Sequence, residues 1–400
     1  MDSVARQEHG RTAEQPPRTC LVYLPHSYAG RGPAESCVQL LSAFPGSGWN
    51  VHLYLTRARR SISCGIKVHD AAGPLLRHVP YRLIERWSRG RLKRRFRRAL
   101  DRAPAGSVAW FWPDAPIDLV RYARDRGMVT VREMINSPWA HARPILDAAF
   151  AAAGLPPTHG ISEESIAREN AELAQYDFVY ACNGEVEEAL RMRGIAESRI
   201  LRSSFGWSRS RFPGRDRAES DGGPFRACFV GTVNVRKGIA VLLEAWRLSG
   251  IQGELLLAGT IEEGLRPLVE QAIREGSGIV ELGPLDEPAQ LYRTCDVFVF
   301  PTFEEGGPQV TYEAAACGLP IITTPMGAAR LVVDGATGLI VPPGNPPALA
   351  DALRRMAGDP ALRETMARAA CHAVQKFEYR QVSEDRVRLL ETIACRQWTG

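Results

Sequence analysis

The sequence predicts an α/β protein built from two doubly wound, Rossmann-like domains that face each other across a cleft. Its 400 residues exceed an ordinary single domain and suit two domains of about 200 residues. Short apolar runs alternate with longer stretches of helical period, which is typical of α/β proteins. A polar stretch rich in Gly, Ser and Arg at 206–224 interrupts this alternation and predicts a linker between the domains.

Composition excludes several other classes of protein. Hydrophobic residues make up 45% and charged residues 24% of the chain, so a largely disordered protein is excluded. No apolar run approaches 18 residues, so no membrane-spanning helix is expected. Residues 1–19 are polar and are expected to form a flexible tail rather than a secretory signal. The nine scattered cysteines contain no C-x-x-C pair and predict buried free thiols in a reducing compartment.

The first domain, 20–205, is expected to contain strands where short apolar runs occur. These runs lie at 20–24, 51–55, 108–112, 129–131, 178–182 and 200–203. The clearest helix between them covers 162–175, because Ser162 suits an N-cap and Glu164 makes the first turn acidic.

The second domain, 225–375, has a more regular pattern. Strands are expected at 227–230, 254–258, 279–282, 297–300, 320–323 and 338–341. Their nearly continuous apolar character predicts a parallel sheet covered on both faces. Residues 376–400 are expected to form a C-terminal helix that packs back on the first domain. A ligand would lie in the cleft, at the carboxyl ends of the strands.

The most informative segment is 301–320, which follows the strand ending at Phe300. A glycine-rich turn leads into a helix that begins near Pro308, and such a helix N-terminus favours an anion such as phosphate. Glu305 lies in the turn and Glu313 about one turn into the helix. A carboxylate accepts two hydrogen bonds and can bind vicinal hydroxyls. A capped helix with a solvated acidic turn is the alternative explanation.

Three segments resemble one family in order and spacing. The E-x7-E element from Glu305 to Glu313 with its Ala-Cys-Gly-Leu-Pro run, the loop at 229–239 and the loop at 334–344 resemble the group-1 (family 4) retaining glycosyltransferases. The resemblance extends over about 140 residues. It implies the GT-B fold, with an acceptor-side domain followed by a nucleotide-sugar domain.

The resemblance also implies roles for individual residues. Glu313 would bind the ribose hydroxyls, Glu305 would approach the reacting face of the sugar, and Lys237 would neutralise the diphosphate. The backbone would contact the sugar and the diphosphate at Gly306, Gly307, Pro308, Gln309, Val310 and Thr311.

The sequence departs from the family pattern at three places. Thr232 stands where members carry an arginine, and Arg236 could supply the missing charge unless it points away from Lys237. In the N-terminal loop, Gly32 is retained for approach to the sugar, but Pro33 replaces a glycine. His141 is the candidate for a histidine near the reacting sugar, with a purely structural role as the alternative.

No D-x-D motif occurs, so charge neutralisation by Lys, Arg and helix N–H groups predicts a metal-independent enzyme without a cofactor. The expected donor is a UDP- or GDP-sugar and the expected acceptor a glycan or lipid-linked saccharide. The resemblance implies retention at the anomeric carbon. A nucleotide-sugar epimerase or hydrolase is the alternative enzyme, and a nucleotide- or glycan-binding pseudoenzyme is the alternative outside catalysis.

The net charge of +5 is unevenly distributed, because residues 82–102 carry ten basic and two acidic side chains. Trp87, Leu92, Phe96 and Leu100 lie close to one helical face. This pattern predicts either an interfacial helix on an anionic membrane or a helix packed on the first sheet. The rest of the chain is nearly neutral, so a nucleic-acid partner is not expected. The expected location is cytoplasmic, peripheral on the inner face of the membrane.

Overall fold

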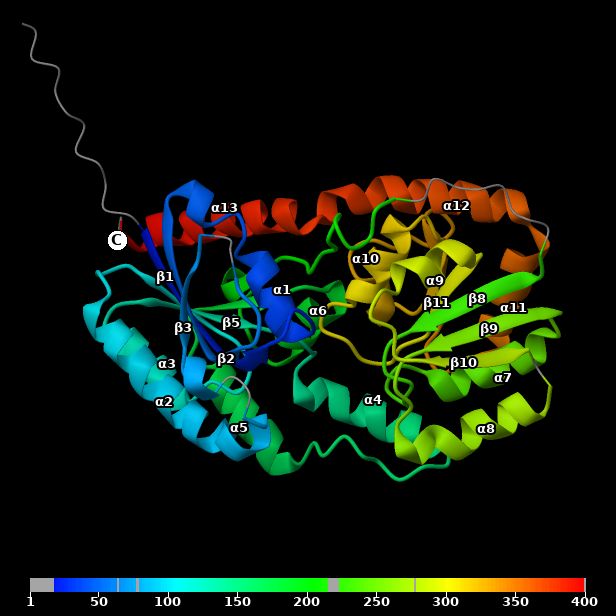
Figure 1. Ribbon diagram of the computed structural model, residues 1–400, viewed down its shortest axis with the longest axis horizontal. Helices are drawn as coiled ribbons and strands as arrows, with labels where there is room; N and C mark the ends of the chain where they lie inside the picture. Colours follow the sequence, from blue (N-terminus) through cyan, green and yellow to red (C-terminus); the bar gives the residue numbers. More distant parts are fainter. Residues whose placement is uncertain (1–17, 63–64, 77–78, 215–222, 277, 399–400) are drawn as a thin grey trace, which may run out of the picture.

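The chain folds around two parallel sheets, which lie on the left and the right of Figure 1. The computed structural model describes residues 18–62, 65–76, 79–214, 223–276 and 278–398. The first sheet has seven strands in the order β3-β2-β1-β4-β5-β6-β7, and the second has six in the order β10-β9-β8-β11-β12-β13. The change of direction beside the first strand of each sheet is the doubly wound arrangement that the sequence predicts.

The first sheet confirms the predicted strands and adds one. Its strands are β1 (Arg18–Tyr28), β2 (Trp49–Ala58), β3 (Lys67–Asp70), β4 (Val108–Phe111), β5 (Val129–Glu133), β6 (Phe178–Ala181) and β7 (Ile200–Arg202). The short edge strand β3 was not predicted, because Lys67–Asp70 contains a single aliphatic residue. Since β1 begins at Arg18, residues 18 and 19 belong to the sheet and not to the expected tail, whose other residues lie outside the described part of the chain.

Helices cover both faces of this sheet. They are α1 (Pro33–Leu40), α2 (Tyr81–Arg102), α3 (Ile117–Asp125), α4 (Trp139–Ala152), α5 (Glu163–Leu173) and α6 (Gly184–Met192), with short 3-10 turns η1 (Pro45–Ser47), η2 (Pro74–Leu76) and η3 (Glu197–Arg199). Side chains of β1 alternate between the two faces: Val22 joins one hydrophobic core and Tyr23 the other. Ser162 caps α5 as expected, with Ser165 completing the capping box.

The structure of helix α2 shows where the apolar stripe of the basic segment lies: it packs on the first sheet. Leu92, Phe96 and Leu100 are fully buried against the first sheet, so they are core residues. Trp87 does not share their face, because its exposed fraction is 45%, and Leu83 one turn earlier is 76% exposed. The apolar stripe therefore stabilises the domain, and a different face of the helix meets solvent.

The second sheet contains the strands expected from the sequence. They are β8 (Phe225–Val230), β9 (Gly253–Ala258), β10 (Ile279–Gly283), β11 (Val297–Phe300), β12 (Ile321–Thr323) and β13 (Gly338–Ile340). The helices and 3-10 turns around it are α7 (Ile239–Ser249), η4 (Glu263–Leu265), α8 (Arg266–Arg274), α9 (Ala289–Thr294), α10 (Gln309–Ala316), η5 (Met326–Ala328), α11 (Pro346–Gly358), α12 (Pro360–Ala373) and η6 (Val374–Phe377).

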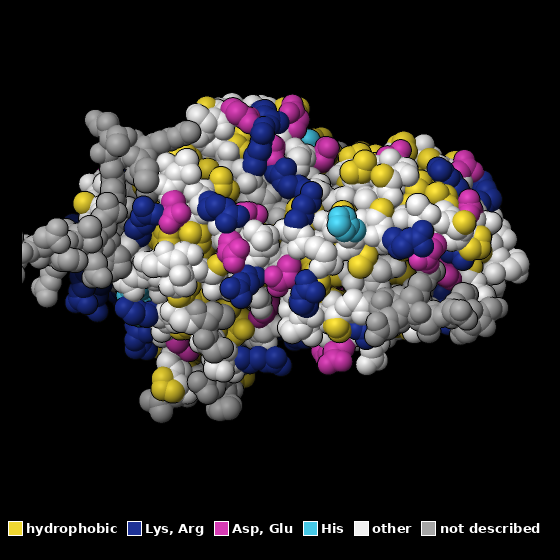
Figure 2. Space-filling view, turned by 90° about the horizontal axis from the view of Figure 1, so that it is seen from above, with side chains coloured by type: hydrophobic (Ala, Val, Ile, Leu, Met, Phe, Trp, Pro, Cys, Tyr) yellow, Lys and Arg dark blue, Asp and Glu magenta, His cyan; other side chains and the backbone are white. Residues whose placement is uncertain are grey.

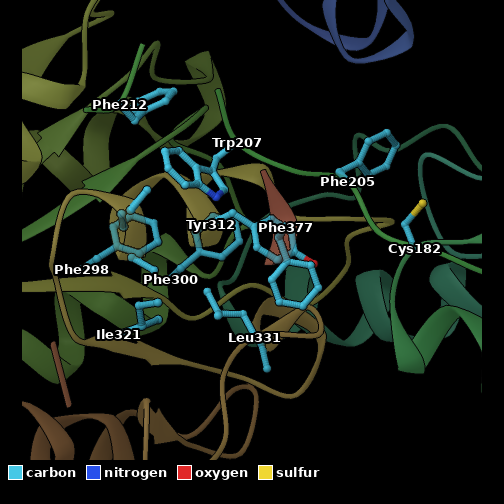
Figure 3. Close-up of a cluster of buried hydrophobic side chains, with 14 of the residues drawn as sticks. Cys182, Phe205, Trp207, Phe212, Phe298, Phe300, Tyr312, Ile321, Leu331 and Phe377 are labelled. Atoms are coloured by element: carbon cyan, nitrogen blue, oxygen red, sulfur yellow. The ribbon is translucent and has the colours of Figure 1, made fainter. Parts of the chain in front are cut away.

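The predicted linker is anchored at its start. Trp207 is buried, donates its indole N–H to the carbonyl of Val374 at 2.9 Å, and lies with Tyr312 and Phe377 in the hydrophobic cluster of Figure 3. Phe212 is also buried there. The aromatic residues thus fix the first part of 206–224 on the second domain, and residues 215–222 lie outside the described chain.

The last helix, α13 (Tyr379–Trp398), returns to the first domain and contacts α1. With α12 it runs along one side of both sheets (Figure 1). Figure 2 views the molecule from this side and shows acidic and basic side chains interspersed. Seven of the cysteines are shown as free thiols, six of them buried, as expected. No helix among the described residues is long and apolar enough to span a bilayer.

Candidate active site

The candidate site begins where β11 ends. After Phe300 the chain turns through residues 301–308 and enters α10 at Gln309, with Pro308 as the N-cap residue. Glu305 is buried in this turn, and its carboxylate accepts a hydrogen bond from the Thr302 hydroxyl at 3.2 Å. The strand, turn and helix N-terminus predicted from 301–320 are thus present.

Two cations face Glu305. The ammonium of Lys237 forms an ion pair with Glu305 Oε1, and Arg236 Nη1 lies 3.9 Å from the same oxygen. Lys237 Nζ also lies 4.9 Å from the centroid of the Phe300 ring, at the end of β11. Arg236 and Lys237 converge because residues 235–238 form a turn, in which successive side chains do not alternate as they do in a strand.

Gly238 explains why this turn lies so close to β11. Its φ is +74°, and a Cβ atom there would come within 2.0 Å of the carbonyl oxygen of Pro301. Only glycine allows both the left-handed backbone and the close approach. Thr232, which replaces the arginine of the family pattern, is exposed.

The charges around Glu305 favour its ionised form. Burial by itself would raise the pKa of the Glu305 carboxyl, but Lys237 and Arg236 outweigh that effect and hold the pKa below its usual value. Burial lowers the pKa of Lys237 against the opposing pull of Glu305. The pKa of Arg236 is raised, because attraction to Glu305 and Glu304 exceeds the cost of its burial.

Glu313 occupies a different environment on α10. It is half-buried, and burial raises the pKa of its carboxyl to about 7, against a smaller lowering by Arg211. The group therefore titrates near neutral pH. A ligand that donates hydrogen bonds would favour its ionised form.

The turn between Glu305 and α10 packs tightly on the first domain. A Cβ atom on Gly306 would lie 2.1 Å from the carbonyl carbon of Ile135, and one on Gly307 would lie 2.2 Å from the Phe205 ring. Both glycines are therefore required by contact between the domains. At the start of α10, Val310 is half-buried, and the hydroxyl of buried Thr311 donates to the carbonyl of Gly327 at 2.8 Å.

The N-termini of α1 and α10 meet where the two domains are in contact. Gly32 is the N-cap residue of α1, with φ of +68°, and Pro33 occupies the first helical position, which suits proline. Gln309 Nε2 donates to Ser36 Oγ of α1 at 2.8 Å, and Tyr379 donates its hydroxyl proton to Gln309 Oε1 at 2.6 Å. The positive ends of both helix dipoles thus face the same region, which favours an anionic ligand.

A pocket of about 490 Å³ opens in the first domain at the carboxyl ends of β1, β4 and β5. It is lined by His26, Pro113, Asp114, Ala115, Pro116, Ile117, Arg132, Met134, Ile135, Asn136, Trp139, Arg168, Glu169 and Glu172. His26 Nε2 and Arg132 Nε are buried there without a hydrogen-bond partner among the described residues, and Arg132 Nη1 forms an ion pair with Glu172 at 3.3 Å. Burial raises the pKa of Glu169 to about 7.

His141 lies in the first turn of α4, where its N–H bonds to the carbonyl of Pro138. Among the described residues, no hydrogen bond joins its ring to Lys237 or Glu305. It is not among the residues that line the pocket, where His26 is the histidine present.

Sequence reasoning missed His26, Arg132 and Asn136, because nothing in the local sequence indicates that β1 and β5 end at one pocket. It also passed over Glu304, although the Glu-Glu pair at 304–305 was visible. Glu304 is 2% exposed and accepts hydrogen bonds from Asn136 and Ser137 of the first domain.

These features define a GT-B protein: two Rossmann-like domains, with an acidic turn and a helix N-terminus at the cleft. Sucrose-phosphate synthase from Thermosynechococcus elongatus superposes with a TM-score of 0.71 at 20% identity, covering 95% of this chain and 99% of that one. Anabaena HepE in complex with UDP and glucose superposes with a TM-score of 0.65 at 16% identity, covering 94% of this chain and all of the other.

Sequence comparison finds a family similarity in the second domain. Residues 224–359 match the model of the group 1 glycosyl transferases. A D-inositol 3-phosphate glycosyltransferase of Pseudarthrobacter chlorophenolicus is 36% identical over 169 residues, which is 39% of this chain and 40% of that relative. The similarity to the group 1 glycosyl transferases is thus established for the second domain of the chain. The aligned region spans less than half the length of this curated relative.

Proposed function

We propose that the protein is a retaining, metal-independent glycosyltransferase that moves a sugar from a UDP- or GDP-sugar to a saccharide acceptor. The observation that carries the proposal is the Glu305 carboxylate held by Lys237 and Arg236 beside the N-terminus of α10. The presence of UDP in HepE, a protein of the same fold, agrees with a nucleotide ligand.

In this proposal the diphosphate binds at the start of α10, where the first N–H groups of the helix have no partner within the helix. Lys237 and Arg236 would neutralise the negative charge that grows on the diphosphate as the sugar leaves, and one preorganised donor of this kind contributes about 3 kcal/mol. Glu305 would face the reacting side of the sugar, and Glu313 would accept hydrogen bonds from the ribose. Retention at the anomeric carbon rests on the family resemblance.

The acceptor would occupy the pocket of the first domain. Asn136 lines this pocket and also donates a hydrogen bond to Glu304. Since Glu304 precedes Glu305 in the chain, the pocket lies beside the acidic turn. The unpartnered His26 Nε2 and Arg132 Nε, together with the carboxylates of the wall, suit a ligand with many hydroxyl groups. We propose a glycan or a lipid-linked saccharide.

The exposed face of α2 supports a membrane-associated acceptor. Leu83 and Trp87 are exposed on the face opposite the buried stripe. Six basic side chains of α2 are exposed, Arg82, Arg86, Arg94, Arg97, Arg98 and Arg102. Exposed apolar residues among cations are typical of peripheral binding to anionic lipid, so we propose that α2 rests on such a surface.

A thermal-shift screen of UDP- and GDP-sugars tests the donor assignment. A ligand at 100 times its Kd stabilises the folded protein by about 2.7 kcal/mol, so the correct donor should raise Tm distinctly. Glu313→Ala should weaken binding of the matching nucleoside diphosphate by about 1.5–3 kcal/mol. Absence of any shift across the panel would reject the proposed donor class.

An epimerase or hydrolase is the second candidate, because Asp114, Glu169 and Glu172 gather at the pocket. Such an acidic group could serve proton transfer at the sugar instead of acceptor binding. The two functions differ in their products. A hydrolase or epimerase would release free nucleotide or an altered sugar from the donor without an acceptor, whereas the transferase would need the acceptor.

A further inference from the structure

A single carboxylate joins the two domains directly beside Glu305. Glu304 Oε2 accepts hydrogen bonds from Asn136 Nδ2 at 2.9 Å and from Arg236 Nη1 at 3.2 Å. Its Oε1 accepts hydrogen bonds from the backbone N–H of Ser137 at 2.8 Å and from the Ser137 hydroxyl at 3.0 Å. Asn136 and Ser137 follow β5 in the first domain, whereas Arg236 belongs to the second.

The backbone around Glu304 is also in contact across the cleft. Gly306 packs on the peptide between Ile135 and Asn136 so closely that any side chain would collide with it. The loop that follows β5 and the loop that follows β11 are therefore in direct contact. The hydrogen bonds to Glu304 belong to this closed arrangement, because separating the domains would remove Asn136 and Ser137 from the carboxylate.

These contacts change what Arg236 is free to do. In separated domains, Arg236 would be the remaining one of these partners of the Glu304 carboxylate. In the closed arrangement the carboxylate is buried, and a buried carboxylate without partners is costly. With the domains together, Asn136 and Ser137 supply three hydrogen bonds to the carboxylate. Arg236 can then turn toward an anion without leaving Glu304 unpaired.

We propose that Glu304 is a positioning residue that couples closure of the two domains to the release of Arg236 for the diphosphate. The coupling to the diphosphate rests on the donor site proposed above. The closure contact itself does not depend on any ligand. The two parts can therefore be measured separately.

Exchanging the amide and the carboxylate tests the contact. Asn136→Asp places a second carboxylate against Glu304 and should open the domains. In the double variant Asn136→Asp/Glu304→Gln, the amide introduced at 304 can donate to the carboxylate introduced at 136. This restored hydrogen bond should bring the two domains together again. The radius of gyration from small-angle X-ray scattering should rise in the single variant and return in the double variant. Circular dichroism and thermal unfolding confirm that each variant is folded.

Nucleotide binding is measured on the same proteins, with UDP and GDP as probes in calorimetry. We expect Asn136→Asp to bind the preferred nucleotide about tenfold more weakly and the double variant to recover most of this loss. Asn234→Asp is the matched control for closure, because Asn234 Nδ2 donates to Glu262 at 2.7 Å within the second domain. It repeats the clash of carboxylates without touching the first domain, so its radius of gyration should not change.

The outcomes separate the two parts. An unchanged radius of gyration in Asn136→Asp, or no recovery in the double variant, overturns the closure contact even if UDP or GDP binds well. If scattering changes as expected but the wild type binds neither UDP nor GDP, the donor site and the coupling to it are overturned. That result would support only the closure contact. Should Asn136→Asp fail to fold, Asn136→Leu removes the same hydrogen bond without adding charge and should also raise the radius of gyration.

Discussion

Arg386 of α13 and Glu133 at the end of β5 form an ion pair with both side chains completely buried, Nη1 lying 2.7 Å from Oε2. The guanidinium carbon lies 4.2 Å from the ring centroid of Tyr180, and the indole of Trp110 donates to the same carboxylate at 3.1 Å. Nearby charges and hydrogen bonds outweigh burial and raise the pKa of Arg386 further above its usual value. The buried Arg386–Glu133 ion pair therefore fixes the C-terminal helix to the first domain. Removing either partner alone would leave an unpaired buried charge and destabilise the fold.

Removing Arg386 should destabilise the protein strongly. Arg386→Ala leaves the Glu133 carboxylate buried and without its cation, which should lower the free energy of unfolding by about 3–5 kcal/mol. Urea denaturation measures the change. Arg388→Ala is the control on the same helix, since that side chain is exposed and pairs with Asp385, and its effect should stay within about 0.5 kcal/mol. Equal effects of the two substitutions would contradict the assignment.

Lys237→Ala should lower turnover more than it lowers nucleotide affinity. The ammonium is paired with Glu305 in the free protein. In the proposed reaction it matters most when charge grows on the departing diphosphate. We expect kcat to fall about 10²–10³-fold with the donor identified by the thermal-shift screen. Lys376→Ala removes an exposed lysine far along the chain and should leave kcat unchanged. A rise in KM with normal kcat would mean that Lys237 only holds the substrate. Addition of a chelator should leave the wild-type rate unchanged.

Nucleotide affinity should depend on pH through Glu313. Because its pKa is about 7, protonation below pH 7 removes the acceptor that we propose for the ribose hydroxyls. The Kd of the nucleoside diphosphate should therefore rise as pH falls from 8 to 6, by at most tenfold per pH unit. Protonation of the ligand itself affects the wild type and Glu313→Gln alike. The difference between their Kd values at each pH therefore reports the Glu313 carboxyl alone. Parallel pH profiles would exclude the ribose contact.

The unliganded protein should show the opposite dependence at this residue. The folded pKa of about 7 lies above the usual 4.5, so Glu313 costs stability increasingly as pH rises from 4.5 to 7. Glu313→Gln should accordingly raise Tm more at pH 8 than at pH 5. A Tm difference independent of pH would mean that the carboxyl is not desolvated.

Binding of α2 to membranes should depend on its exposed cations. The variant replaces four of the six exposed arginines with Gln, namely Arg82, Arg86, Arg94 and Arg98. Each basic residue near an anionic surface contributes about 1 kcal/mol, so the variant should lose most of its binding to vesicles containing anionic lipid in flotation. Lys93 and Arg95 are poorer targets, because Lys93 pairs with Asp118 at 2.8 Å and Arg95 donates to the carbonyl of Asp70.

A charge-matched control separates α2 from net charge. It replaces with Gln four exposed arginines elsewhere, Arg193, Arg274, Arg368 and Arg380. This control should float with the vesicles as the wild type does. Neither protein should bind neutral vesicles, and salt should weaken the binding that occurs. Equal flotation of both variants would show that the exposed face of α2 does not contact lipid.

Local sequence was sufficient for much of the fold and for part of the site. Strands were predicted correctly where apolar residues run together, because burial between two helical layers requires such runs. The edge strand β3 was missed, since an edge strand needs little apolar surface. Glu305 and Lys237 came from spacing shared with a family, and the structure brings them into contact. His141 came from the same resemblance and stays a prediction; the histidine that lines the pocket of the first domain is His26.

The sequence by itself determined the two-domain α/β class and the segments able to bind an anion, because periodicity and turn chemistry are local properties. Only the tertiary structure decided which way side chains face. Leu92 and Phe96 turned out to be core and Trp87 exposed, since the docking of α2 on the sheet selects one face of the helix. It also brought Glu304 to Asn136, 168 residues away along the chain. Such a contact depends on how two separately folded sheets meet, which no local pattern encodes.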